Sequence, residues 1–189
     1  MLGGSFDPIH NGHLLAAERV AQQFKLDRVL FVPAGEQWQK AQQTPAAHRL
    51  AMTQLAVANH SNFEVSTVDI DRGGATYTID TLTQLRQQFP TADLFFILGT
   101  DAWSGIKTWR SWQELGALAT FVVVTRPGFN LGEIEAPEGL LAEQVNIGAV
   151  DLSSTQCRAR AMAGESLAGL VPEPVITYIR DQNLYQEAE

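Results

Sequence analysis

Short apolar runs alternate with helical patterns along the chain, and this alternation restricts the fold more than any other feature. Between the runs, apolar residues recur at spacings of three and four, as at Leu14, Ala17, Ala21 and Phe24. Strands joined by helices need crossover connections, so we expect an α/β fold: a Rossmann-like, doubly wound parallel sheet with helices on both faces. The predicted strands cover 28–33, 63–70, 94–99, 120–125 and 145–152, and further predicted helices cover 46–58, 78–89 and 111–118.

The length of 189 residues fits a single domain covering 1–189, with a helical portion from about residue 153. Prolines and glycines between Pro127 and Gly139 make that stretch the best candidate for a long surface loop or a small insertion. No apolar run approaches the roughly 20 residues of a membrane span, and no basic, apolar signal sequence opens the chain. We therefore expect a cytoplasmic protein without a membrane partner.

Cys157 is the one cysteine of the chain, which excludes an internal disulfide framework and a multi-cysteine zinc site and suits a reducing compartment. We expect its side chain to be a small buried apolar group rather than a nucleophile. The net charge of −8 argues against a nucleic-acid partner, because proteins that bind nucleic acid usually display clustered Lys and Arg. Any anionic ligand must therefore be held by local donors.

The stretch GGSFDPIHNGH, residues 3–13, is typical of an anion site. Gly3 and Gly4 allow close approach of the backbone to a ligand, and a helix that begins between residues 11 and 13 would place His10 and His13 at its N-terminus. A turn with two surface histidines is the alternative, and a zinc site would need further ligands. Because only two residues precede the glycines, we expect a first strand that is shortened or a natural start upstream of Met1, and we favour the second.

The stretch DLSSTQCRAR, residues 151–160, carries a second phosphate-type signal. Hydroxyl residues follow a predicted strand and precede a helical pattern, so Ser153 or Ser154 is either an ordinary N-cap or part of an anion site. In a helix, Arg158 shares a face with Ser154 and Thr155 and could clamp the same anion with two hydrogen bonds. Two anion sites at helix termini, far apart in sequence, indicate a polyphosphate ligand.

These two stretches resemble the HxGH and ISSTxxR signatures of the nucleotidyltransferase superfamily. The closer resemblance is to the bacterial nicotinate mononucleotide adenylyltransferase family, and it covers the chain nearly from end to end. Its remaining blocks are similar to RGGATYTIDTL (72–82), FILGTDAW (96–103), KTWRSWQEL (107–115), VVTRPGF (123–129) and LVPEPVITYIRDQNLY (170–185). Cys157 and Leu152 replace the isoleucines that are usual in the family, and both changes are apolar.

The resemblance implies transfer of AMP from ATP to nicotinate mononucleotide, which gives deamido-NAD and pyrophosphate with Mg²⁺ assisting. Direct displacement at the α-phosphorus needs alignment and charge neutralisation rather than a nucleophile, so His10 and His13 are the expected catalytic residues. The expected ATP contacts are Gly3, Gly4, Ser5, Phe6, Gly99, Asp101, Ser154, Thr155 and Arg158. Asp101 would meet the ribose or help to organise the metal, with a helix N-cap as its alternative. No residue is assigned as a dedicated metal ligand.

The expected contacts for nicotinate mononucleotide are Lys40, Tyr77, Thr78 and Trp109. Trp109 would stack on the pyridine ring, and Trp112 could equally be the stacking residue or plain core. Lys40 could equally be an ordinary exposed lysine. Whether copies of the chain associate as a homo-oligomer is left open by the sequence.

Three other functions compete with this one. Phosphopantetheine adenylyltransferase shares both phosphate signatures, but TYTIDTL and the TW pair favour a pyridine mononucleotide as acceptor. A non-catalytic nucleotide sensor could have lost either histidine, whereas this chain has both. A class I aminoacyl-tRNA synthetase fragment is remote, because the chain lacks a KMSKS-like sequence and a basic surface for tRNA.

Overall fold

The sheet is entirely parallel and contains six strands in the order β3-β2-β1-β4-β5-β6. In a computed structural model of the chain, residues 1–36, 44–125, 137–148 and 152–186 are described. The strands are β1 (Leu2–Gly4), β2 (Val29–Pro33), β3 (Phe63–Val65), β4 (Phe95–Gly99), β5 (Thr120–Thr125) and β6 (Ala142–Asn146). Leu2 lies opposite both Phe31 and Ile97, so β1 is the central strand from which the order grows in both directions. This is the expected doubly wound sheet.

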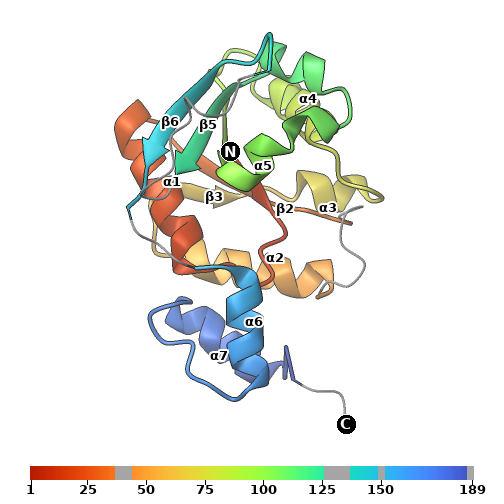
Figure 1. Cartoon of the computed structure of the whole chain (residues 1–189). Coiled ribbons are helices and arrows are strands. Elements are labelled where there is room, and N and C mark those ends of the chain that lie inside the picture. Colours follow the sequence, from red (N-terminus) through yellow and green to blue (C-terminus); the bar gives the residue numbers. More distant parts are fainter. Residues whose placement is uncertain (37–43, 126–136, 149–151, 187–189) are drawn as a thin grey trace.

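Helices cover both faces of the sheet (Figure 1). They are α1 (Asn11–Phe24), α2 (Ala46–Val57), α3 (Val68–Arg72), α4 (Thr78–Gln88), α5 (Thr100–Ser104), α6 (Ser154–Met162) and α7 (Glu173–Asp181), with 3₁₀ turns η1 (Ile106–Thr108) and η2 (Trp112–Ala117). Successive side chains of a strand point to opposite faces. Ile97 and Val122 accordingly pack in the cluster that includes α1 and α2, whereas Phe96 and Phe121 pack in the cluster that includes α4 and α5.

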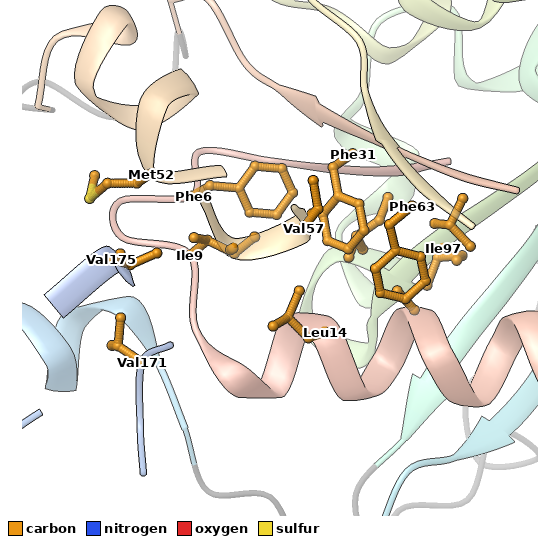
Figure 2. Close-up of a cluster of buried hydrophobic side chains, with 14 of the residues drawn as sticks. Phe6, Ile9, Leu14, Phe31, Met52, Val57, Phe63, Ile97, Val171 and Val175 are labelled. Atoms are coloured by element: carbon orange, nitrogen blue, oxygen red, sulfur yellow. The ribbon is translucent and has the colours of Figure 1, made fainter. Parts of the chain in front are cut away.

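The first helix illustrates how the sequence pattern produces this packing. Leu14, Ala17, Val20 and Ala21 of α1 are all buried, and they lie on the helix face defined by spacings of three and four. Figure 2 shows Leu14 pointing from this helix into the cluster of aromatic and aliphatic side chains. Lys25 ends the helix in the left-handed conformation, with φ of 50°.

The predicted strand 63–70 is wrong beyond Val65, because the chain turns into α3 at Val68. The helical turn brings Asp69 within 2.6 Å of the guanidinium of Arg72, three residues along. Thr67 at the start of this helix donates a hydrogen bond of 2.6 Å to the carboxylate of Asp71.

Two further predictions needed correction. The strand predicted at 145–152 begins and ends earlier, since Ala142 to Asn146 pair with β5 and Gly148 follows with a φ of 81°. The start of β6 was not predicted because its residues are polar. Such residues are tolerated there, since β6 is an edge strand with a neighbour on one side only. The helix predicted at 111–118 is the tighter 3₁₀ turn η2. Part of the loop predicted between Pro127 and Gly139 lies outside the described residues.

Helices α6 and α7 lie together beside α2, away from α3 and α4 (Figure 1). Val171 and Val175 belong to the same buried cluster as Ile9 and Met52, and Figure 2 shows these four side chains near one another. The C-terminal helices therefore share the main core with the sheet. In the described parts of the chain, no helix has the length and apolar composition needed to cross a membrane.

Candidate functional site

A cavity of about 840 Å³ lies where the strand order reverses, at the carboxyl ends of β1 and β4. Gly3 and Gly4 at the end of β1 and Gly99 at the end of β4 line its floor. Open parallel sheets bind ligands at this position, because the connections after neighbouring strands leave it in opposite directions. The cavity collects twelve of the fifteen residues that the sequence nominated as site residues: Gly3, Gly4, His10, His13, Tyr77, Thr78, Gly99, Asp101, Trp109, Ser154, Thr155 and Arg158.

His10 and His13 lie at the N-terminus of α1, as predicted. His10 is the N-cap residue, and its backbone N–H donates to Nδ1 of His13 at 3.2 Å. Because Nδ1 accepts, the proton of a neutral His13 ring is on Nε2, which makes Nε2 a donor. The two rings stack with centroids 3.6 Å apart and planes inclined by 21°. Both line the cavity, so donors converge at the positive end of a helix.

Ser5 and Phe6, also expected to contact ATP, are buried and do not belong to the cavity wall. The Phe6 ring instead packs edge-on against His13, with centroids 5.1 Å apart. Phe6 has a φ of 51°, a conformation that non-glycine residues adopt rarely, and this turns its ring inward. Gly4 faces that ring: a Cβ atom on Gly4 would lie 3.2 Å from it. Phe6 thus packs against His13 and Gly4 and does not line the cavity itself.

The N-terminal turns of α6 contact the loop of residues 3–13, which carries the first phosphate-type signal. Ser153 is the N-cap, since its hydroxyl accepts the backbone N–H of Gln156 at 3.1 Å, whereas Ser154 donates to the carbonyl of Pro8 at 2.9 Å. Arg158 donates to the carbonyl of Asp7 at 2.8 Å and to the hydroxyl of Thr155 at 3.4 Å. Two stretches about 150 residues apart in sequence thus form one continuous wall of donors.

A group of aromatic and hydroxyl side chains also lines the cavity, and we call this group its aromatic end. Tyr77, Thr78 and Trp109 line it, and Trp109 packs edge-on against Phe96 of β4 with centroids 6.0 Å apart. The guanidinium of Arg110 lies 4.8 Å from the centre of the Tyr77 ring. Trp112 is outside the cavity and packs on the core cluster of α4 and α5, so of the two tryptophans only Trp109 is placed to stack on a ligand.

Asp69 and Arg110 line the cavity but were missed by the sequence analysis. Asp69 is buried and accepts hydrogen bonds from Arg72 and Thr81, and burial raises its pKa above the ordinary value of 3.8. It was missed because its segment was interpreted as a strand. Arg110 directly follows Trp109 and pairs with Asp80 at 3.3 Å, so its place beside a nominated residue was the available signal.

The remaining candidates have separate outcomes. Asp101 is exposed, lies in the first turn of α5 and lines the cavity. Lys40 lies outside the described residues. Cys157 is fully buried, as predicted, and its burial raises the pKa of the thiol. Among the described residues, no group of three or more His, Cys, Asp or Glu side chains could hold a metal ion.

Comparison with known proteins gives a family model and two close relatives in sequence. The cytidylyltransferase-like family model matches residues 1–160. The chain is 52% identical to the probable nicotinate-nucleotide adenylyltransferase of Corynebacterium kroppenstedtii, over 98% of this chain and 89% of that protein. It is 50% identical to the protein of the same description in Streptomyces coelicolor, over 98% and 99% of the two chains.

A solved structure shares the fold. It is that of Plasmodium falciparum nicotinic acid mononucleotide adenylyltransferase complexed with NaAD, with a TM-score of 0.83 and 21% identity over 97% of this chain and 95% of that chain.

Proposed function

This chain belongs to the nicotinate-nucleotide adenylyltransferase family, and from that premise we propose that its cavity holds ATP and nicotinate mononucleotide side by side and transfers AMP from the first to the second. The products are deamido-NAD and pyrophosphate, so the reaction is a step of NAD biosynthesis. We place it in the cytoplasm, where reducing conditions suit a chain with a single buried cysteine.

The observation that carries the site assignment is the junction of the two phosphate signals. Ser154 and Arg158 of α6 bond to the carbonyls of Pro8 and Asp7, just before the residue that caps α1. Donors from two helix N-termini therefore face one cavity, which is the arrangement that a triphosphate requires. The aromatic end with Tyr77 and Trp109 has the composition expected for the pyridine ring of the acceptor.

The geometry supports a direct displacement. An oxygen of the nicotinate mononucleotide phosphate bonds to the α-phosphorus of ATP while the bond from that phosphorus to the bridging oxygen breaks, and pyrophosphate leaves with the electron pair. Charge builds up on the phosphate oxygens as this happens. His13, whose Nε2–H is fixed as a donor by the bond to Nδ1, and His10 would stabilise that charge, while Thr155 and Arg158 hold the departing pyrophosphate.

The carboxylates that line the cavity, Asp69 and Asp101, are few, which fits a Mg²⁺ ion that is bound mainly by substrate phosphates. Magnesium needs only one or two protein carboxylates when phosphates supply other ligands. Asp69 is already bonded to Arg72 and Thr81, so Asp101 is the carboxylate that would hold the ion or, instead, the adenosine ribose. When bound, Mg²⁺ would neutralise part of the charge on the phosphates.

The test is to mix the protein with ATP, Mg²⁺ and one acceptor at a time, and to measure pyrophosphate and identify the product. The acceptors are nicotinate mononucleotide, nicotinamide mononucleotide and phosphopantetheine. We expect rapid release with nicotinate mononucleotide. Release with phosphopantetheine alone would support the rival transferase, and ATP binding without release from any acceptor would support a nucleotide sensor.

A further inference from the structure

Asp7 belongs to the loop between β1 and α1 that carries His10; it is buried and does not line the cavity. Its Oδ1 atom accepts the hydroxyl of Tyr185 at 2.6 Å, and its Oδ2 atom accepts the backbone N–H of Thr44 at 3.2 Å. Hydrogen bonds to an ionised group are roughly twice as strong as neutral ones. The loop is therefore attached to the segment that follows α7, 178 residues away in sequence.

Other groups fix the backbone of the same loop. Arg49 of α2, which is 1% exposed, donates to the carbonyl of Ser5 in this loop at 2.8 Å and to that of Gly35, which follows β2, at 2.6 Å. On the other side, Ser154 and Arg158 hold the carbonyls of Pro8 and Asp7. All of these groups bond to backbone carbonyls. The carboxylate of Asp7 is held instead by Thr44 and Tyr185. Like Arg49 and Thr44, Tyr185 comes from a segment that forms no part of the cavity wall.

The segment around Tyr185 is held in an unusual conformation. Asn183 has a φ of 50° and Tyr185 a φ of 60°, and non-glycine residues adopt such angles only where their surroundings compensate the strain. Burial, and secondarily the bond to the Asp7 carboxylate, raise the pKa of Tyr185 far above its ordinary value. A tyrosine hydroxyl with its ordinary pKa of 10 is already protonated at physiological pH, and the raised pKa keeps this donor in place at alkaline pH as well.

We propose that Tyr185 is a positioning residue for adenylyl transfer: by fixing Asp7, it sets the geometry of the loop that presents His10 to the cavity. This inference rests on the proposed function, because it assumes that His10 and His13 act on the phosphates. It assigns to the C-terminal segment a part in turnover, in addition to its packing on the core. A displacement of about 1 Å at a reacting centre can reduce turnover up to about 100-fold, so one hydrogen bond that aligns the loop has a measurable effect.

The test compares two variants that each lose a single phenolic hydroxyl, Tyr185→Phe and Tyr178→Phe. The hydroxyl of Tyr178 lies 2.9 Å from Nδ1 of His48 and joins α7 to α2 without touching the loop, so Tyr178→Phe is the matched control. We expect Tyr185→Phe to lower kcat about tenfold with less than a twofold change in KM for ATP. Tyr178→Phe should keep kcat near the wild-type value, and the two variants should have similar melting temperatures.

Equal kcat in the two variants, or a loss that follows melting temperature alone, would overturn the positioning role. If the wild-type protein releases no pyrophosphate with any acceptor, the proposed function fails, and this inference fails with it. If the wild type is active and Tyr185→Phe is equally active, the inference alone fails.

A double-mutant cycle with Asp7→Asn gives a second, independent measurement. In Asp7→Asn the Tyr185 hydroxyl no longer meets a charged acceptor, so adding Tyr185→Phe should lower kcat by a smaller factor than it does in the wild-type background. If the two kcat factors simply multiply, Tyr185 does not act through Asp7 and the proposal is wrong.

Discussion

The Nδ1 atom of His13 accepts the backbone N–H of His10, so this residue helps to start α1 as well as facing the cavity. The variant His13→Asn separates these two tasks. Its amide oxygen can take the place of Nδ1, but no group replaces the Nε2–H donor. We expect kcat to fall about 100- to 1,000-fold in both His13→Asn and His13→Ala, as when an oxyanion donor is removed. ATP affinity should change much less, because the charge develops in the transition state.

Thermal unfolding provides the control for these two variants. His13→Asn should stay close to wild-type stability, whereas His13→Ala should lose about 0.5–2 kcal/mol with the capping interaction. Near-wild-type turnover in His13→Asn would remove this histidine from the proposed mechanism.

Arg110 places a positive charge beside Tyr77, in the part of the cavity where we propose that the acceptor binds. The carboxylate of nicotinate only accepts hydrogen bonds, whereas nicotinamide brings an NH₂ group that would face these donors. Asp69 also lines the cavity, but Arg72 and Thr81 hold its carboxylate. We expect kcat/KM for nicotinate mononucleotide to exceed that for the amide by on the order of 100-fold or more.

The variant Arg110→Gln should lower this ratio about tenfold, because it keeps a donor but loses the charge. Arg28→Gln is the control, since Arg28 pairs with Glu64 on the surface and does not line the cavity. Both mononucleotides are measured at the same ATP and Mg²⁺ concentrations. Equal kcat/KM values in the wild type, or a preference for the amide, would mean that the acceptor end is assigned wrongly.

At the scale of elements, the short helix α3 places a buried carboxylate against α4. Burial raises the pKa of Asp69 above its value in an unfolded chain, so folding disfavours the ionised form. Below both pKa values the group is protonated in both states and this cost vanishes; above the folded-state pKa the cost is complete. Asp69→Asn keeps an oxygen for Arg72 and Thr81 but does not titrate. We therefore expect the free energy of unfolding of Asp69→Asn minus that of wild type to be more positive at pH 7 than near pH 4, so the variant gains relative stability as the pH rises.

Urea unfolding of the two proteins at several pH values measures this difference. Other carboxylates affect both proteins alike, so only the difference between the two free energies of unfolding is informative. A gap that widens towards acid pH, or that is independent of pH, would show that burial does not dominate the energetics of Asp69.

The elements that the sequence predicted well are those with strong periodicity. The run TFVVVT is β5 at its full predicted extent, and the helix predicted at 46–58 is α2 to within one residue. Sequence patterns failed where tertiary contacts decided the local structure. Asp69 turns into a helix because Arg72 and Thr81 provide partners that periodicity does not reveal, and polar residues of β6 join the sheet because β5 offers an edge.

The residues that line the cavity were easier to predict from the sequence than the residues that hold its loops in place. Ring donors and hydroxyl groups at helix starts have local signatures, so His10, His13 and Ser154 could be nominated from their neighbours in sequence. Arg49, Asp7 and Tyr185 join segments that are distant in sequence, and no local pattern indicates which carbonyl or carboxylate each will meet. Phe6 was nominated through a motif, but its positive φ, which turns the ring away from the cavity, is visible only in the fold.

At the scale of the whole molecule, α7 packs on α2 and shares one buried cluster with the sheet. Val175 is fully buried in this cluster beside Ile9 and Met52 (Figure 2). A helical portion that shares its core with the sheet should unfold together with it, so we expect a single transition for the chain. Of the four tryptophans, Trp103, Trp109 and Trp112 report on the sheet region by fluorescence and Trp38 lies outside the described residues, whereas circular dichroism also reports on α6 and α7.

The variant Val175→Ala tests this coupling. Loss of two buried methyl groups should cost about 1–3 kcal/mol, and each kcal/mol lowers the melting temperature of a chain of this size by about 2–4 °C. Because the cluster is shared, tryptophan fluorescence and circular dichroism should shift by the same amount, although the substituted helix contains no tryptophan. Leu141→Ala, at a side chain that is 75% exposed, should change stability by less than about 0.5 kcal/mol. If circular dichroism shifted while fluorescence did not, the C-terminal helices would form a separate cooperative unit, and the single-domain prediction for residues 1–189 would be wrong.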